Sequence, residues 1–237
     1  MSDKDSKYDA STELLEAINS NLVDTVIDLS EIDLRAGLIS LTGKDSLLAD
    51  IPVLKWMISG SKIVSRISTI LSIRKFSAFI KPIKDSAVFE NEDSKEKLLE
   101  ICGTKKKLDF VIEQTLFSLD KYDTEIKARW LARMFVATFK EKNFSVDEYN
   151  AIQFSINSLN PITSVKTLEF YYNYYKQKKE VGIINDRIEL QRINMDYSPL
   201  VLSGFLHLPK GGTFCDNPGG ASINDLGIRF YENIIKE

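Results

Sequence analysis

Seven basic side chains and no acidic one lie between Ile51 and Lys84. They are Lys55, Lys62, Arg66, Arg74, Lys75, Lys81 and Lys84. The residues between them are mostly aliphatic or aromatic, so the segment is apolar and cationic at once. Ammonium and guanidinium groups bind carboxylates and phosphates through charge-assisted hydrogen bonds. The chemistry that this pattern indicates is therefore recognition of an acidic or anionic surface.

The predicted partner-binding residues come from this basic segment and from a second basic cluster further along the chain. They are Lys55, Lys62, Arg66, Arg74, Lys75, Lys105, Lys106 and Lys107. On a helical wheel Lys55, Lys62 and Arg66 fall on one stripe, and we expect them to face outward. The opposite face is apolar, and we expect it to be buried; it contains Trp56, Ile63, Ile67 and Leu71.

Several interpretations of the basic amphipathic helix 52–81 fit this pattern. It can be a core helix with a solvated basic stripe, or a helix that binds an acidic protein partner. It can also lie on an anionic membrane surface, peripheral to the inner membrane, with its basic residues towards the lipid head groups. A membrane-acting effector would release the helix on activation. Nucleic acid bound by the same residues is a further alternative.

The charge of the chain is unevenly distributed, and this constrains the partner. The net charge is −7 for residues 1–50, +7 for 51–84 and −4 for 85–100, against −3 for the whole chain. A globally basic nucleic-acid binder is therefore not expected, whereas a local basic surface is. The acidic flanks can restrain the basic helix electrostatically, and salt would weaken that restraint.

No arrangement of residues typical of catalysis or metal binding stands out. The chain has one histidine, His207, and two cysteines, Cys102 and Cys215. His207 is expected on a partly buried strand, and Cys102 in a buried helix. Lys210-Gly-Gly-Thr213 lacks the spacing of a phosphate-binding loop. We therefore expect a non-enzymatic protein without metal or cofactor.

A tyrosine-rich segment offers an alternative site for single-stranded nucleic acid. Its tyrosines precede three lysines, and stacking faces beside positive charge suit exposed bases. The segment contains Tyr171, Tyr172, Tyr174, Tyr175, Lys176, Lys178 and Lys179. Helical geometry sends these tyrosines to several faces, so some of them must belong to the core.

Apolar residues at helical spacing, together with capping residues, predict the elements. We expect a first helix with Ser11 or Thr12 as its cap, and a helix over 52–72 followed by a bend or a second short helix over 73–81 that ends at Pro82. Further helices are expected over 98–119 with a break near Gly103, and over 124–142 with Ile126 in the apolar set. Two more are expected from the capping box Ser145–Glu148 to Asn160, and from Ser164. A strand near Leu206 is expected to pair with 213–215, and Ser222 is expected to cap the last helix.

These elements predict a mainly α protein, a multi-helix bundle with a small C-terminal α+β appendage that contains one short hairpin. The expected divisions are an acidic N-terminal helical segment 1–45, a helical core domain 46–182 and the appendage 183–237. The polar N-terminus does not have the pattern of a secretory signal. No transmembrane helix is expected, because every run of 18 residues contains a charge. The cytoplasm is the expected compartment.

The tail carries Ser203-Gly-Phe-Leu206, a Gly-rich turn and Asn224-Asp-Leu-Gly-Ile-Arg-Phe230. This pattern resembles the winged-helix-like end of many bacterial helical proteins and the tails of abortive-infection proteins of phage defence. Segments 50–53 and 71–76 are similar to a poorly characterised bacterial helical group. The resemblance implies a bacterial, phage-related accessory protein. It does not imply base reading, because the candidate recognition helix 195–203 contains Pro199 and no Lys or Arg.

Overall fold

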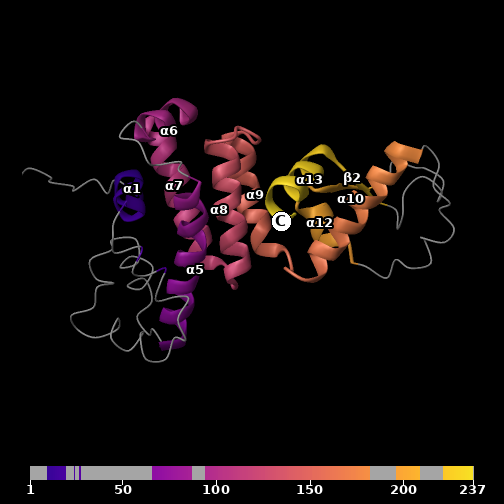
Figure 1. Cartoon of the computed structure of the whole chain (residues 1–237), viewed down its shortest axis with the longest axis horizontal. Coiled ribbons are helices and arrows are strands. Elements are labelled where there is room, and N and C mark those ends of the chain that lie inside the picture. Colours follow the sequence, from indigo (N-terminus) through magenta and orange to yellow (C-terminus); the bar gives the residue numbers. More distant parts are fainter. Residues whose placement is uncertain are drawn as a thin grey trace, which may run out of the picture. The chain divides into compact units, whose positions relative to one another are not determined.

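The computed structural model describes residues 10–19, 24, 27, 66–86, 94–181, 196–208 and 221–236. Within them the chain is mainly helical, with nine α-helices, one π-helical turn and a two-stranded sheet (Figure 1). The elements are α1 (Ala10–Asn19), α5 (Arg66–Asp85), α6 (Ser94–Cys102), α7 (Lys105–Lys121), α8 (Glu125–Phe139), α9 (Val146–Ser158), α10 (Thr163–Val181), α12 (Ser198–Leu202), β1 (Leu206–His207), β2 (Ser222–Ile223), α13 (Asp225–Phe230) and the π-helical turn η4 (Tyr231–Ile235). They form two compact units, Met1–Gln153 and Phe154–Glu237.

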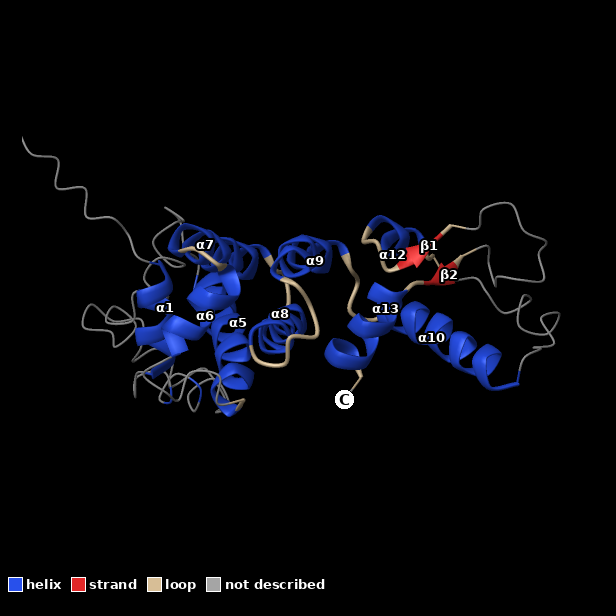
Figure 2. Ribbon diagram, turned by 90° about the horizontal axis from the view of Figure 1, so that it is seen from above, coloured by secondary structure: helices blue, strands red, loops and turns tan. Residues whose placement is uncertain are grey.

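The first unit is a helical bundle built around α5. Figure 2 shows α7 and α9 in one layer above α5 and α8. A broad face of α5 between residues 72 and 83 is buried, because its apolar residues recur at intervals of three and four. Those with exposed fractions of 1% or less are Ile73, Phe76, Phe79, Ile80 and Ile83.

α5 and α8 are parallel neighbours, as two contacts at opposite ends of the pair show. Near the N-terminal end of α8, Arg74 Nη1 lies 3.6 Å from Glu125 Oε1. Near the C-terminal ends, Lys140 Nζ donates to the carbonyl oxygen of Ser86. Two parallel helices need a connection that returns along their length, and α7 supplies it.

Local capping signals determine where several of these helices begin. Thr124 accepts a hydrogen bond from the backbone of Lys127 at 3.4 Å and caps α8, as predicted. The Ser145 hydroxyl accepts from the Glu148 amide at 3.1 Å, and the Glu148 carboxylate accepts from the Ser145 amide at 2.8 Å. The predicted capping box before α9 is therefore confirmed. Gly103, with φ of 79°, separates α6 from α7 at the predicted break.

An aromatic cluster joins four helices of the bundle. The Phe135 ring on α8 packs edge-on against Phe79 of α5 and Tyr149 of α9, with centroids 6.2 and 6.0 Å apart. The Tyr149 hydroxyl lies 2.8 Å from the Thr115 hydroxyl of α7. Because burial disfavours the phenolate, the pKa of Tyr149 is raised well above its ordinary range.

The boundary expected at Pro82 is wrong, because α5 is one continuous helix that includes Pro82 and ends at Asp85. Ile83 is fully buried beyond the proline, so its packing holds the last turn in place. Ser86 then ends the helix, with its amide donating to the Pro82 carbonyl at 3.1 Å. Of the expected helix 52–72, residues 52–65 lie outside the described ranges.

Neither Ser11 nor Thr12, the two possible caps of the first helix, takes that position, because both lie inside α1. The Ser11 hydroxyl donates to Asp109 Oδ1 of α7 at 2.8 Å. Ile126, which we placed in the apolar set of α8, is 45% exposed. In both cases the residue type fitted a local sequence pattern, but the position of the residue depends on how the helices pack together.

The second unit packs α10 against the C-terminal elements. Phe205 stacks on Phe230 with ring centroids 4.3 Å apart, and Tyr172 lies against Tyr231 at 4.4 Å. β1 and β2 are antiparallel. Gly227 lets α13 approach β1 closely, since a Cβ there would lie 2.3 Å from the Phe205 carbonyl oxygen.

One prediction about the tail is wrong, and another concerns residues outside the described ranges. Ser222 does not cap the last helix, because it belongs to β2. Asn224 caps α13, accepting from the Gly227 amide at 2.8 Å. The observed partner of β1 is β2, whereas the expected return strand 213–215 lies outside the described residues.

The mainly helical class and a small C-terminal sheet are thus confirmed. The winged-helix-like character of the appendage stays a prediction. α10 belongs with the C-terminal unit, so the expected core domain 46–182 does not coincide with the first unit. Most of the expected segment 1–45 lies outside the described residues.

Candidate anion-binding pocket

A pocket of about 600 Å³ opens between α5 and α8. From α5 it is lined by a stripe at helical spacing, which comprises Arg74, Ser77, Ala78, Lys81, Pro82 and Asp85. Glu125, Arg129 and Arg133 of α8 recur at intervals of four, so they share one face of that helix. Ser86 completes the lining. Two helix faces thus supply both walls of one pocket, and its volume is typical of ligand sites.

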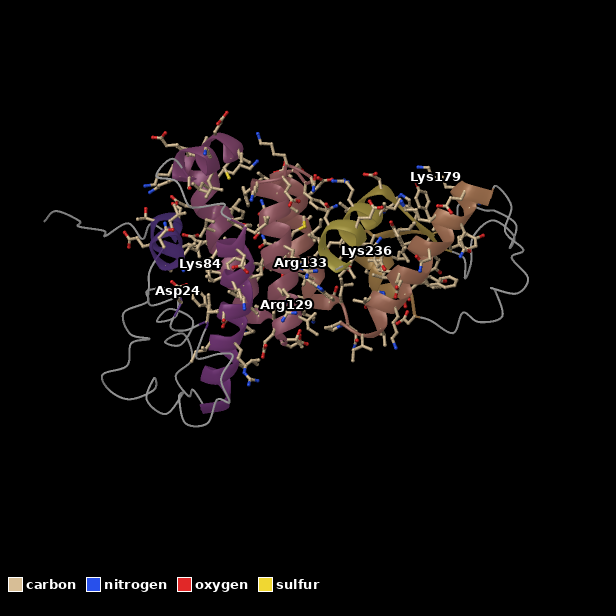
Figure 3. The ribbon with its side chains drawn as sticks, in the orientation of Figure 1. Asp24, Lys84, Arg129, Arg133, Lys179 and Lys236 are labelled. Carbon is tan, nitrogen blue, oxygen red and sulfur yellow. The ribbon has the colours of Figure 1, made fainter. Side chains whose placement is uncertain are left out.

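The two contacts between α5 and α8 fix the level of each basic residue. Counting along the helices from the Arg74–Glu125 pair places Arg129 level with Ala78, and Arg133 about one turn higher, level with Pro82. In Figure 3 Arg129 and Arg133 are labelled on successive turns of α8. The lining therefore carries basic side chains at successive levels, together with two small residues, Ser77 and Ala78.

The lining carries more positive than negative charge. Arg74, Lys81, Arg129 and Arg133 contribute four cations, whereas Asp85 and Glu125 contribute two carboxylates. Both parallel helices direct the negative ends of their dipoles towards the end near Asp85. A bound anion is therefore more stable in the middle of the pocket than beside Asp85.

Among the predicted partner-binding residues whose side chains the structure describes, Arg74 alone lines this pocket. Its guanidinium and the Glu125 carboxylate are 42% and 40% exposed, so their ion pair is weak. Lys55 and Lys62 lie outside the described residues. Arg66 begins α5, but its side chain is also outside the described part of the structure.

Lys75 faces the interior, which corrects its assignment to the partner-binding set. It is 4% exposed, and its ammonium donates to the backbone carbonyls of Asp120 and Tyr122 at 2.7 and 2.9 Å. Burial lowers the pKa of Lys75, against the opposing effect of Asp120 and Asp123. Lys75 is thus a structural residue that caps the C-terminal end of α7.

The Lys105–Lys107 cluster is exposed and forms the first turn of α7. Lys107 Nζ lies 3.1 Å from Asp147 Oδ1, so this cation already has a carboxylate beside it. Thr104 caps the helix directly before the cluster, accepting from the Lys107 amide at 3.2 Å. None of the three lysines lines the pocket between α5 and α8.

The lone histidine and Cys102 do not belong to the pocket between α5 and α8. His207 is exposed on β1, which corrects the expectation of a partly buried side chain. Cys102 is buried, as expected, and burial raises the pKa of its thiol. Among the described residues, no group of three His, Cys, Asp or Glu side chains is arranged to hold a metal ion.

The tyrosine-rich segment contributes mainly to the core of the second unit. Tyr171 and Tyr172 are buried, as we expected for part of this segment. The Tyr172 hydroxyl donates to Glu232 Oε1 at 2.6 Å, and Lys176 Nζ lies 3.3 Å from the same oxygen. Tyr172 and Lys176 therefore hold η4 against α10, whereas the Tyr171 ring packs against Tyr197 with centroids 6.5 Å apart.

Sequence analysis did not predict that Lys81, Arg129 and Arg133 line one pocket. The spacing of four residues between Glu125, Arg129 and Arg133 was visible in the sequence, and it places these three on one helix face. The missing signal was that α5 and α8 are neighbours, which no local pattern in the chain encodes.

Comparisons with protein-family models, with curated proteins and with solved structures found no match for this chain. The resemblance of the tail to abortive-infection proteins therefore stays a prediction. Within the described ranges, no helix is long and apolar enough to cross a membrane.

Proposed function

We propose that this chain is a non-enzymatic interaction protein that binds an acidic group of a partner protein in the pocket between α5 and α8. The observation that supports this most strongly is the excess of four cations over two carboxylates in the lining of one pocket. Arginine forks are suited to carboxylates and phosphates, since they donate two parallel hydrogen bonds. A projecting acidic side chain can enter such a concave site.

The shape of the pocket favours a protein partner over the two alternatives. A membrane presents a plane of head groups, and an extended basic surface meets it better than a concave site does. Single-stranded nucleic acid is held by a basic groove with aromatic stacking faces. The lining of this pocket contains no aromatic residue.

The test compares two charge reversals of equal size. Arg129→Glu/Arg133→Glu changes the pocket, and Lys105→Glu/Lys106→Glu changes the exposed start of α7 by the same charge. Binding of a fluorescein-labelled peptide of alternating Asp and Gly is measured by anisotropy at 50 and 150 mM salt. We expect at least a tenfold loss for the pocket variant and less than a twofold change for the α7 variant.

Anionic liposomes and labelled oligonucleotides are measured beside the peptide. Equal losses for both variants would show that only net charge matters, and would contradict the proposal. Binding of liposomes or oligonucleotides without binding of the peptide would favour the membrane or nucleic-acid alternative. Far-UV circular dichroism of each variant checks that the bundle still folds.

A further inference from the structure

The exposed face of α7 carries two phenylalanine rings that are each about half exposed. Phe110 is 52% exposed and Phe117 is 45% exposed. The two residues are seven positions apart, so they lie on one side of the helix, about 10.5 Å from each other along its axis. α7 lies along the edge of the bundle in Figure 2. Single exposed apolar residues are common on proteins, but aromatic rings gathered on one helix face are typical of a docking surface.

Charged residues share this face with the two rings. Glu113 lies between Phe110 and Phe117, and Lys121 follows one turn after Phe117; both charged side chains are exposed. On a wheel at about 100° per residue, the four residues fall within about 80° of one another. The Lys121 ammonium lies 5.2 Å from the centroid of the Phe117 ring, so its charge is held beside that ring. These four residues form the α7 stripe.

The α7 stripe is complementary to a second copy of itself that runs in the opposite direction. With a two-fold axis midway between the phenylalanines, Phe110 of each copy lies level with Phe117 of the other. Glu113 of the second copy then lies about 4.5 Å along the axis from the level of Phe117 in the first. The Lys121 ammonium is held at that ring, so the carboxylate of the second copy is within its reach. Symmetry gives two aromatic pairs and two ion pairs.

We propose that this chain forms an antiparallel homodimer through the α7 stripe, with Phe110 packed against Phe117 of the second copy and Lys121 paired with Glu113 of the second copy. A parallel arrangement is disfavoured, because it sets each charged residue of the stripe opposite its own like charge. None of the four residues lines the pocket between α5 and α8, so the dimer and the proposed function can fail independently.

The expected dimer is weak, because the stripe is small. A phenylalanine has about 150–250 Å² to bury, so the exposed halves of four rings supply roughly 400 Å² of apolar surface. The stems of the charged side chains add to this, but we expect the total to stay below the roughly 1,200 Å² of stable, specific interfaces. We therefore expect a reversible dimer with a dissociation constant of about 10–100 μM.

Sedimentation velocity of the full chain tests the aromatic contact, over concentrations of about 5–500 μM that bracket the expected dissociation constant. We expect the wild type to change from monomer to dimer over this range, and Phe117→Glu to raise the dissociation constant at least tenfold. The control is Leu202→Glu, which adds the same charge at an 87% exposed leucine of α12 and should change it less than twofold.

Two results of this experiment would overturn the proposal. A wild type that stays monomeric at every concentration would leave the α7 stripe to a partner of another sequence. Equal weakening by Phe117→Glu and Leu202→Glu would show that net charge, and not the stripe, governs association.

The ion pairs test the direction of the two helices without changing either ring. Glu113→Lys and Lys121→Glu each set like charges against each other in the antiparallel dimer, so each should raise the dissociation constant at least fivefold. The double variant Glu113→Lys/Lys121→Glu exchanges the charges and restores both pairs, and we expect a value within threefold of the wild type. A double variant as weak as the single ones would overturn the antiparallel arrangement.

The charge variants also keep the proposal falsifiable if Phe117→Glu fails to fold. Glu113 and Lys121 are exposed, so their replacement should leave the bundle folded, which far-UV circular dichroism checks. Single reversals that leave self-association unchanged would contradict the proposal, because in the antiparallel dimer each reversal removes two ion pairs.

Discussion

Replacement of the buried lysine of α5, Lys75→Met, should destabilise the first unit. Its ammonium donates to two carbonyl oxygens at the end of α7, at 2.7 and 2.9 Å. Hydrogen bonds from a charged donor contribute about 1.5–3 kcal/mol each, so about 3–6 kcal/mol of interaction is lost. The methionine side chain is uncharged, so the variant has no desolvation penalty for a buried ammonium, and this offsets several kcal/mol of the lost interaction. We expect a net decrease of about 2 kcal/mol in the free energy of unfolding, or roughly 30-fold in the folding equilibrium.

The assay is urea unfolding followed by the fluorescence of the buried Trp130, in a Trp56→Phe background so that one tryptophan reports. The control is Lys106→Met, which removes an exposed lysine of α7. Equal stability of Lys75→Met and the wild type, or an equal loss in the control, would refute the capping role. A changed slope of unfolding against urea would indicate an altered unfolded or native state instead.

The difference between Lys75→Met and the wild type should also depend on pH. Burial lowers the pKa of Lys75 in the folded protein from its ordinary value of 10.5. Between the lowered pKa and 10.5 the unfolded chain binds more protons, so the stability of the wild type rises with pH there. The methionine variant lacks this contribution, and the difference in stability should widen as pH rises towards 10.5. A difference that narrows would contradict the buried position of the ammonium.

Three other perturbations test the structure away from the pocket. Ser145→Ala removes one half of the capping box and should cost about 1 kcal/mol in urea unfolding; an unchanged midpoint would contradict the observed cap. Gly227→Ala places a Cβ 2.3 Å from a backbone oxygen, whereas Gly204→Ala meets no neighbour at φ of 76°. We expect losses of about 3 and about 1 kcal/mol respectively, and the reverse order would refute the close approach of α13. Alkaline pH should unfold the first unit, because burial raises the pKa values of Tyr122 and Tyr149. The folded protein keeps phenol protons that the unfolded chain loses above about pH 10, so stability should fall from there upwards, and a flat titration of helicity to pH 12 would contradict this.

The local parts of the fold could be predicted from sequence because single residues determine them. Thr124 and the pair Ser145 and Glu148 satisfy backbone groups within three residues, so their pattern is complete in the chain. Pro82 is a counterexample. The rule that a helix ends before proline is outweighed here by the burial of Ile83 on the next position.

The candidate site could be predicted only in part. Arg74 belongs to the predicted set and lines the pocket, whereas its neighbour Lys75 points into the core. Adjacent residues on a helix lie about 100° apart, so a charge pattern alone cannot tell which one reaches the solvent. Arg129 and Arg133 join Arg74 only through packing between helices that are distant in sequence.

Because α5 and α8 are separated in sequence by α6 and α7, the pocket between them is completed late in synthesis. One wall of the pocket is complete at Ser86, and the other only at Arg133. At about 5–20 residues per second, a ribosome adds the intervening residues in roughly 2–10 s. A nascent chain released or cleaved before α8 therefore has half of the pocket. If the proposed function holds, a ligand that needs both walls can stabilise only the finished bundle and cannot assist its first helices to fold.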